Sequence, residues 1–137
     1  MKITRIRVFK TPLPYVDGAY AWGAGNAIEV AMASVVVIDT DAGLQGCGEF
    51  TPCGENYLVA HSEGVEALAK LVAPQLLGAD PRQLGPSEPI LAHPVPDHGA
   101  AQAPFEAACW ALLGKAPVPP VGQPHGGHLP EARPTPP

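Results

Sequence analysis

Candidate binding residues concentrate in a segment that mixes aromatic rings with glycine. Residues Pro14–Asn26, PYVDGAYAWGAGN, contain Tyr15, Tyr20 and Trp22, three of the eight aromatic residues in the chain. Three glycines separate the rings and allow the segment to change conformation. These features predict a mobile loop that closes over a ligand. The alternative is that the rings cover the edge of a small sheet, and both interpretations stay open.

Acidic and metal-binding side chains give weaker signals. Glu49 and Glu55 could form a general acid–base pair, but nothing around them supplies a further base, a metal site or a pocket. Cys47, Cys53 and His61 match no zinc-binding spacing. We therefore assign no catalytic residue and no metal ligand to these positions.

The composition describes a globular protein with few charges. The chain has 137 residues, 46% of them hydrophobic and 15% charged, and a net charge of −5. This size fits one domain, and the acidic balance without a basic stripe argues against nucleic-acid binding. No apolar run is long enough for a membrane span, the N-terminus lacks the apolar segment of a secretory signal, and the three cysteines form no paired spacing. The simplest interpretation is a reduced, cytoplasmic protein.

Three strands are predicted in the first fifty residues, at about Ile3–Lys10, Glu29–Thr40 and Leu44–Phe50. The middle strand is rich in β-branched residues and apolar at both parities, which predicts that both of its faces are covered. Turn residues at Thr40–Gly43 join it to the third strand, which is dotted with glycine.

Two helices follow, each with one apolar stripe. Apolar residues repeat at helical spacing in His61–Ala73 and again in Pro104–Leu113. Pro74 is expected to end the first helix, and Gly114 stands where a glycine commonly follows a helix. Asp80-Pro81 starts a further helical segment, which later prolines interrupt.

Proline dominates the end of the chain. Of the 18 prolines, 13 lie in residues 86–137, and the sequence beyond residue 116 has little apolar bulk and no periodicity. Because such a segment cannot offset the entropy of ordering, we predict a folded domain of residues 1–116 and a Pro-rich disordered tail of residues 117–137. His125 and His128 could bind a metal in this tail, but a third ligand is lacking.

Four segments resemble, in order and spacing, the N-terminal capping domain of the enolase superfamily, of the mandelate racemase and muconate lactonizing enzyme type. The segments are KITRIRVFKTPLP, DAGLQGCGEFTPCGENY, APQLLGADPRQL and APFEAACWALLGKA. The resemblance covers residues 1–116 and implies an α+β fold, in which a three-stranded antiparallel meander is followed by a small helical bundle. The chain departs from the family at Ala111, where an acidic residue often follows the tryptophan, and in the prolines of residues 86–96.

The resemblance also implies a parent activity. Enzymes of this family abstract a proton α to a carboxylate and hold the enolate on Mg²⁺, using carboxylates and lysines or histidines of a barrel domain. A barrel takes about 200 residues or more, whereas 22 residues follow Lys115 and the four lysines form no Lys-x-Lys pair. We therefore expect a truncated chain that holds no cofactor, is inactive alone, and meets a small carboxylate substrate only if a barrel is supplied.

Within the family, the sequence looks closest to the branch that epimerises or dehydrates proline betaines and hydroxyprolines. Two cap loops that close over the barrel mouth map to Pro14–Asn26 and Thr51–Tyr57. An aromatic face can hold a quaternary ammonium group through a cation–π contact worth about 0.5–2 kcal/mol. The resemblance therefore implies that Tyr20, Trp22 and Tyr57 contact the substrate.

Two other classes of function stay open. The prolines Pro117, Pro119 and Pro120 could dock in SH3-like or WW-like grooves, which would make the chain a non-catalytic interaction module. The chain could also be a frameshifted product without function. In addition, a cap without its barrel would expose apolar surface around Trp110, so we expect self-association.

Overall fold

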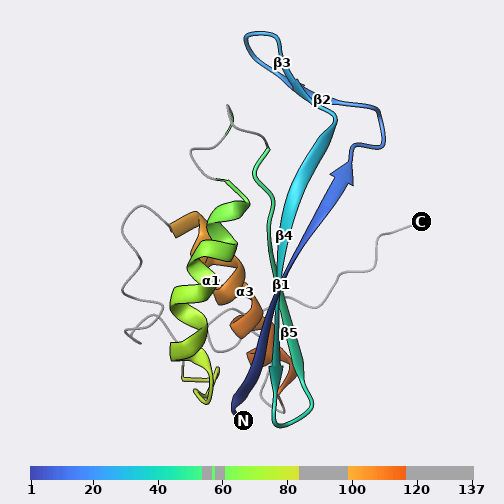
Figure 1. The fold of residues 1–137 in the computed structure, drawn as a ribbon. Helices are drawn as coiled ribbons and strands as arrows, with labels where there is room; N and C mark the ends of the chain where they lie inside the picture. The colour runs from blue at the N-terminus through green and yellow to red at the C-terminus, as the bar shows by residue number, and fades with distance from the viewer. Residues whose placement is uncertain (54–56, 58–60, 84–98, 117–137) are drawn as a thin grey trace, which may run out of the picture.

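The chain folds into a small sheet with two helices against one of its faces (Figure 1). The structure, a computed structural model, describes residues 1–53, 57, 61–83 and 99–116. In chain order the elements are β1 (Ile3–Pro14), β2 (Tyr20–Trp22), β3 (Asn26–Ile28), β4 (Val30–Thr40), β5 (Gln45–Phe50), α1 (Glu63–Leu76) and α3 (Gly99–Lys115). The predicted α+β fold is confirmed.

The main sheet is the predicted antiparallel meander, with the strand order β1-β4-β5. β1 continues four residues beyond its predicted end at Lys10, and Pro14 pairs with Val30 at the far end of β4. Its prolines are compatible with this pairing because β1 is an edge strand. β5 is shorter and ends at Phe50, opposite Ser34 in the middle of β4. The paired ends of β1 and β4 therefore project beyond β5.

α1 ends later than its sequence predicts. The helix begins two residues after His61 and continues beyond Ala73, so that Pro74 lies inside its last turn and does not end it. The extra turn forms because Leu76 is fully buried and extends the apolar stripe of the helix. The chain then turns at Gly78, whose φ of 82° is in the left-handed region that favours glycine.

α3 is longer at both ends than the predicted helix Pro104–Leu113. Pro104 lies within the helix, and Gly114 is helical instead of following the helix. Ala101, in the added N-terminal turn, is buried, and this burial favours the longer helix. Trp110, which we expected to be exposed, is half-buried.

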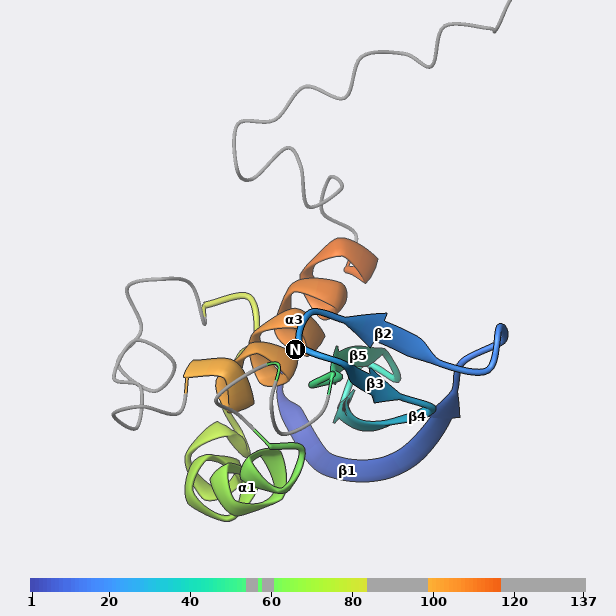
Figure 2. The ribbon, with the colours of Figure 1, turned by 90° about the horizontal axis from the view of Figure 1, so that it is seen from above.

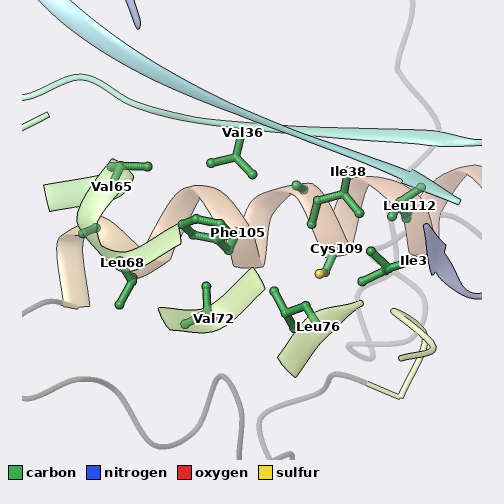
Figure 3. Packing of buried hydrophobic residues seen from close by; sticks show 12 residues of the cluster. Ile3, Val36, Ile38, Val65, Leu68, Val72, Leu76, Phe105, Cys109 and Leu112 are labelled. Atoms are coloured by element: carbon green, nitrogen blue, oxygen red, sulfur yellow. The ribbon is translucent and has the colours of Figure 1, made fainter. Parts of the chain in front are cut away.

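The hydrophobic core lies between the sheet and the two helices (Figure 3). It contains Ile3, Val36, Ile38, Val65, Leu68, Val72, Leu76, Ala101, Phe105, Ala108, Cys109 and Leu112. Each fully buried large apolar side chain contributes about 1.5–3 kcal/mol relative to leaving it exposed. The helical stripes predicted from the sequence are therefore the surfaces that close the core.

Two glycines in β5 allow α3 to lie directly on the sheet. A Cβ atom on Gly46 would overlap the backbone carbonyl of Ala108, and one on Gly48 would overlap the backbone carbonyl of Pro104. Any side chain at either position would therefore push α3 away from β5. The Gly-x-Gly spacing in this strand is a packing requirement, because both glycines face the helix.

The prediction that β4 is covered on both faces is correct only in part. Val36 and Ile38 point to the helices and are fully buried. On the opposite face Ala31 and Ala33 are also buried, whereas Val35 and Val37 are half-buried. Phe9, the partner of Val35 on β1, is 47% exposed. Both helices lie on one side of the sheet, as Figure 2 shows from above. The apolar character of β4 therefore exceeds what the described elements bury.

Three expectations fall outside the described residues: the helical segment after Asp80-Pro81, the histidine pair, and the disordered tail of residues 117–137 with its docking prolines. Asp80 does make the contact expected at a helix start, since its carboxylate accepts a hydrogen bond from the backbone N–H of Arg82 at 3.0 Å. Among the helices that the structure describes, none is long and apolar enough to cross a membrane.

Candidate functional site

The projecting ends of β1 and β4 carry a small antiparallel hairpin, formed by β2 and β3 (Figure 1). Its turn depends on Ala24 and Gly25, whose φ angles of 62° and 76° are left-handed. The Asn26 amide closes the turn by donating a hydrogen bond to the Gly23 carbonyl at 2.8 Å. We predicted a loop here. The glycine-rich turn between two short apolar segments was the signal for a hairpin.

The hairpin brings the three predicted substrate-binding residues together. Tyr20 and Trp22 are two residues apart on β2, and their ring centroids lie 6.0 Å apart. Tyr57, from the segment between β5 and α1, packs edge-on against both rings, with centroids 6.1 Å from Tyr20 and 5.5 Å from Trp22. These distances are typical of favourable aromatic pairs. Two segments that are separate in the sequence therefore build one aromatic surface.

Tyr15 is a fourth member that the predicted substrate contacts did not include. Its ring stacks on Tyr20 with a centroid distance of 5.8 Å, and its hydroxyl donates to the Cys53 sulfur at 3.8 Å. We call Tyr15, Tyr20, Trp22 and Tyr57 the aromatic cluster. The sequence signal for including Tyr15 was its position in the same aromatic segment as Tyr20.

The aromatic cluster is partly open to solvent. Tyr20 is 39% exposed and Tyr57 is 46% exposed, whereas Tyr15 and Trp22 are half-buried. Such a surface can bind a ligand through ring faces, either by apolar contact or by cation–π attraction. The cluster offers aromatic surface and hydroxyl groups, with no charge of its own at neutral pH.

Neighbouring groups keep two of the hydroxyls protonated. A hydrogen bond with Tyr57, followed by electrostatic repulsion from the same residue, raises the pKa of Tyr20 above its ordinary value. The side-chain hydrogen bond with Cys53 is the main cause that raises the pKa of Tyr15. Both groups are therefore neutral hydrogen-bonding partners at physiological pH.

Among the residues that the structure describes, the other chemical candidates do not assemble into a second site. Glu49 is exposed and accepts a hydrogen bond from the Thr51 hydroxyl at 2.6 Å, and Glu55 is outside the described residues. Cys47 is exposed on the sheet. Burial raises the pKa of Cys109 to about 12, with a smaller effect from a nearby carboxylate, so this thiol stays protonated.

Most of the chain matches a known protein family. Residues 21–124 match the family described as "Mandelate racemase / muconate lactonizing enzyme, N-terminal domain". The chain belongs to this family. The capping-domain resemblance is thereby confirmed, and the three-stranded sheet with helices on one face is the fold of that domain.

The relatives of this capping domain include a dehydratase. The chain is 43% identical over 124 residues to a cis-3-hydroxy-L-proline dehydratase from Roseibium aggregatum, covering 90% of this chain and 33% of the relative. A solved mandelate racemase/muconate lactonizing enzyme from Roseovarius nubinhibens is 67% identical, with a TM-score of 0.85, over 94% of this chain and 35% of that one. The chain thus spans about a third of the length of the relatives that it matches.

Magnesium occurs in a further relative. A mandelate racemase/muconate lactonizing enzyme of Roseovarius nubinhibens, solved in complex with magnesium, is 37% identical with a TM-score of 0.84 and is covered to 35%. In the part of this capping domain that the structure describes, no group of three or more His, Cys, Asp or Glu side chains could hold a metal ion. The described residues therefore do not fit a magnesium site.

Proposed function

We propose that this chain is the substrate-capping domain of a mandelate racemase/muconate lactonizing enzyme-like protein, and that its aromatic cluster contacts the substrate. The observation that carries the proposal is the meeting of Tyr20 and Trp22 with Tyr57. A cluster of partly exposed aromatic rings on a projecting hairpin is suited to cover a small ligand held by another domain.

The proposed parent reaction is abstraction of the α-proton of a small, cyclic amino-acid-like carboxylate, in an epimerase or dehydratase. The name of the Roseibium aggregatum relative supports a hydroxyproline-like substrate. The proton-abstracting base and the magnesium ligands would come from a barrel domain. The chain is accordingly proposed to be inactive alone, and α-proton exchange into D₂O by the purified chain would contradict this.

The substrate class explains why the contact would be aromatic. Proline betaine and hydroxyproline both carry a cationic ring nitrogen, and an aromatic face attracts such a cation by about 0.5–2 kcal/mol. Trp22 provides the largest ring of the aromatic cluster, and Tyr57 stands at a right angle to it. We propose that a ligand held between the cap and a barrel contacts this pair of perpendicular rings.

A domain graft tests this function. Residues 1–116 replace the equivalent cap of the 67%-identical Roseovarius nubinhibens enzyme, and α-proton exchange of proline betaine and cis-3-hydroxy-L-proline is followed by NMR in D₂O. Trp22→Ala should raise KM about 2- to 30-fold, which is the equivalent of the cation–π energy above. Phe9→Ala is the control, because Phe9 is an exposed aromatic residue outside the aromatic cluster.

A ligand pair separates cation binding from apolar contact. Tetrahydrofuran-2-carboxylate has the ring and carboxylate of proline without the charged nitrogen. As a competitive inhibitor of the graft, it should lose less affinity than proline betaine when Trp22 is replaced. Equal KM values for Trp22→Ala and Phe9→Ala with proline betaine would overturn the proposed substrate contact.

A further inference from the structure

A single row of paired residues crosses the main sheet where β5 ends. Lys10 on β1 pairs with Ser34 on β4, and Ser34 pairs with Phe50 at the end of β5. Ser34 is fully buried, and it is the one polar residue in the apolar run from Val30 to Ile38. A buried hydroxyl lowers stability unless it is hydrogen-bonded.

The Ser34 hydroxyl is hydrogen-bonded to the start of α1. It donates a hydrogen bond to the backbone carbonyl of Ser62 at 2.9 Å, and the backbone N–H of Val65 donates to the same oxygen at 3.2 Å. Beside it in the row, the Lys10 ammonium contacts the Glu63 carboxylate at 2.7 Å. The first turn of α1 is therefore bound to the middle of the sheet by one buried and one exposed contact.

Both ends of the connection between β5 and α1 meet at Ser34. The connection leaves the sheet after Phe50, which pairs with Ser34 through the backbone, and it returns at Ser62, which Ser34 holds through its side chain. Between these two points lie Cys53, which contacts Tyr15, and Tyr57, which packs against Trp22. The location of the return point limits where Tyr57 can stand.

We propose that Ser34 is a positioning residue that holds Tyr57 against Trp22. Within the described part of the chain, the hydroxyl of Ser34 bonds to Ser62 and to no member of the aromatic cluster, so Ser34 acts through the start of α1. Its role in substrate binding rests on the function proposed above, whereas its role in placing Tyr57 does not. Loss of the hydroxyl removes the buried one of the two contacts that bind the first turn of α1 to the sheet, so we expect the Tyr57 ring to shift from its edge-on contact with Trp22.

The two tryptophans of the chain provide the measurement. With 5-fluorotryptophan incorporated in the full chain, Trp22 and Trp110 give two ¹⁹F resonances, which Trp22→Phe assigns. Tyr57→Leu removes the ring beside Trp22 and defines the direction in which its resonance moves. Ser34→Ala should move the Trp22 resonance in that direction by a smaller amount and leave the Trp110 resonance in place.

Thr40→Ala is the matched control. Thr40 lies on the same strand, is also buried, and donates its hydroxyl to a backbone carbonyl, that of Leu44 at 3.0 Å, at the opposite end of β4. Its loss should leave the Trp22 resonance unchanged. Ser34→Thr keeps the hydroxyl and should restore the wild-type Trp22 resonance, which a purely structural effect of altered volume would not do.

The outcomes separate the two proposals. If Ser34→Ala leaves the Trp22 resonance where Thr40→Ala leaves it, Ser34 does not position Tyr57. Ser34→Ala could also unfold the chain, and the Trp110 resonance would then move to its position in the unfolded chain. In that case Ser34→Cys is the milder variant, and it is judged by the same shift of the Trp22 resonance and the same unchanged Trp110 resonance. Because no substrate is present, these results do not depend on whether Trp22 contacts a substrate in the grafted enzyme.

Discussion

Val30 and Met32 lie on the same face of β4 as Val36 and Ile38, yet the two pairs have opposite environments. Val36 and Ile38 are fully buried beneath the helices, whereas Val30 is 47% and Met32 is 39% exposed on the projecting end. The residue types are nearly the same, and the strand is continuous. The difference comes from where α1 and α3 lie, and an apolar strand is therefore no guarantee of a covered strand.

The two ends of the sheet also use glycine differently. Gly46 and Gly48 at the covered end make room for α3, whereas Gly25 at the projecting end supplies a left-handed turn with nothing near it. The covered end is constrained by close packing, and the projecting end by local backbone geometry. We expect the covered end to determine the free energy of unfolding, and the projecting end to determine ligand contact.

The largest effect is expected for a side chain added between β5 and α3. Gly48→Ala should lower the free energy of unfolding by about 3 kcal/mol or more, because the new methyl group overlaps the backbone of Pro104. Gly23→Ala, in the hairpin turn with open space around it, should change stability by less than about 0.5 kcal/mol. Urea unfolding followed by circular dichroism measures both. Similar losses in the two variants would mean that α3 does not rest on β5.

A second comparison uses two phenylalanines. Phe105 is fully buried in the core, so Phe105→Ala should lower the free energy of unfolding by about 3–5 kcal/mol. Phe9 is exposed and carries the Arg7 guanidinium over its ring at 5.7 Å, so Phe9→Ala should lower it by about 1 kcal/mol or less. A large loss from Phe9→Ala would show that another element covers the open face of the sheet.

The aromatic cluster should respond to alkaline pH. All three tyrosines of the chain belong to it, so tyrosinate absorbance reports on the cluster alone. Because the raised pKa of Tyr20 makes the neutral form more favourable in the folded state, its contribution is complete below the ordinary pKa of about 10 and is lost as pH rises through the raised value. Tyr57→Phe should shift the folded-state titration of Tyr20 down toward that of the unfolded chain. An unchanged titration would mean that the two hydroxyls do not interact.

The smallest effect is expected at the exposed contact between β1 and α1. A hydrogen bond from Lys10 is the main cause that lowers the pKa of Glu63 from 4.5 to about 2. The stabilisation is therefore present above pH 4.5 and is lost as pH falls through about 2. Glu63→Gln should lower the thermal midpoint slightly at neutral pH. The difference from the wild type should vanish as the pH approaches about 2. A difference that persists in strong acid would point to packing as its cause.

Much of the architecture was predictable because it follows from local patterns. The β-branched run of β4, the turn after Thr40 and the helical stripes of α1 and α3 each have one dominant periodicity. Tyr20, Trp22 and Tyr57 were also identified from the sequence, through the resemblance to a capping domain. Their role as substrate contacts stays a prediction.

What the sequence could not determine depends on contacts between distant segments. The predicted ends of β1 and of both helices were wrong. Pairing with β4 extends β1, and burial of Leu76 and Ala101 extends the helices, past prolines that would end isolated elements. The partial exposure of Val35 and Val37 on β4 depends on both helices lying on the other side of the sheet. The joining of Tyr57 to Trp22 depends on where Ser34 holds α1, a contact between residues 28 positions apart in the chain. Periodicity and composition describe neighbours in sequence, whereas these features are set by packing and hydrogen bonds that form only when the tertiary structure is complete.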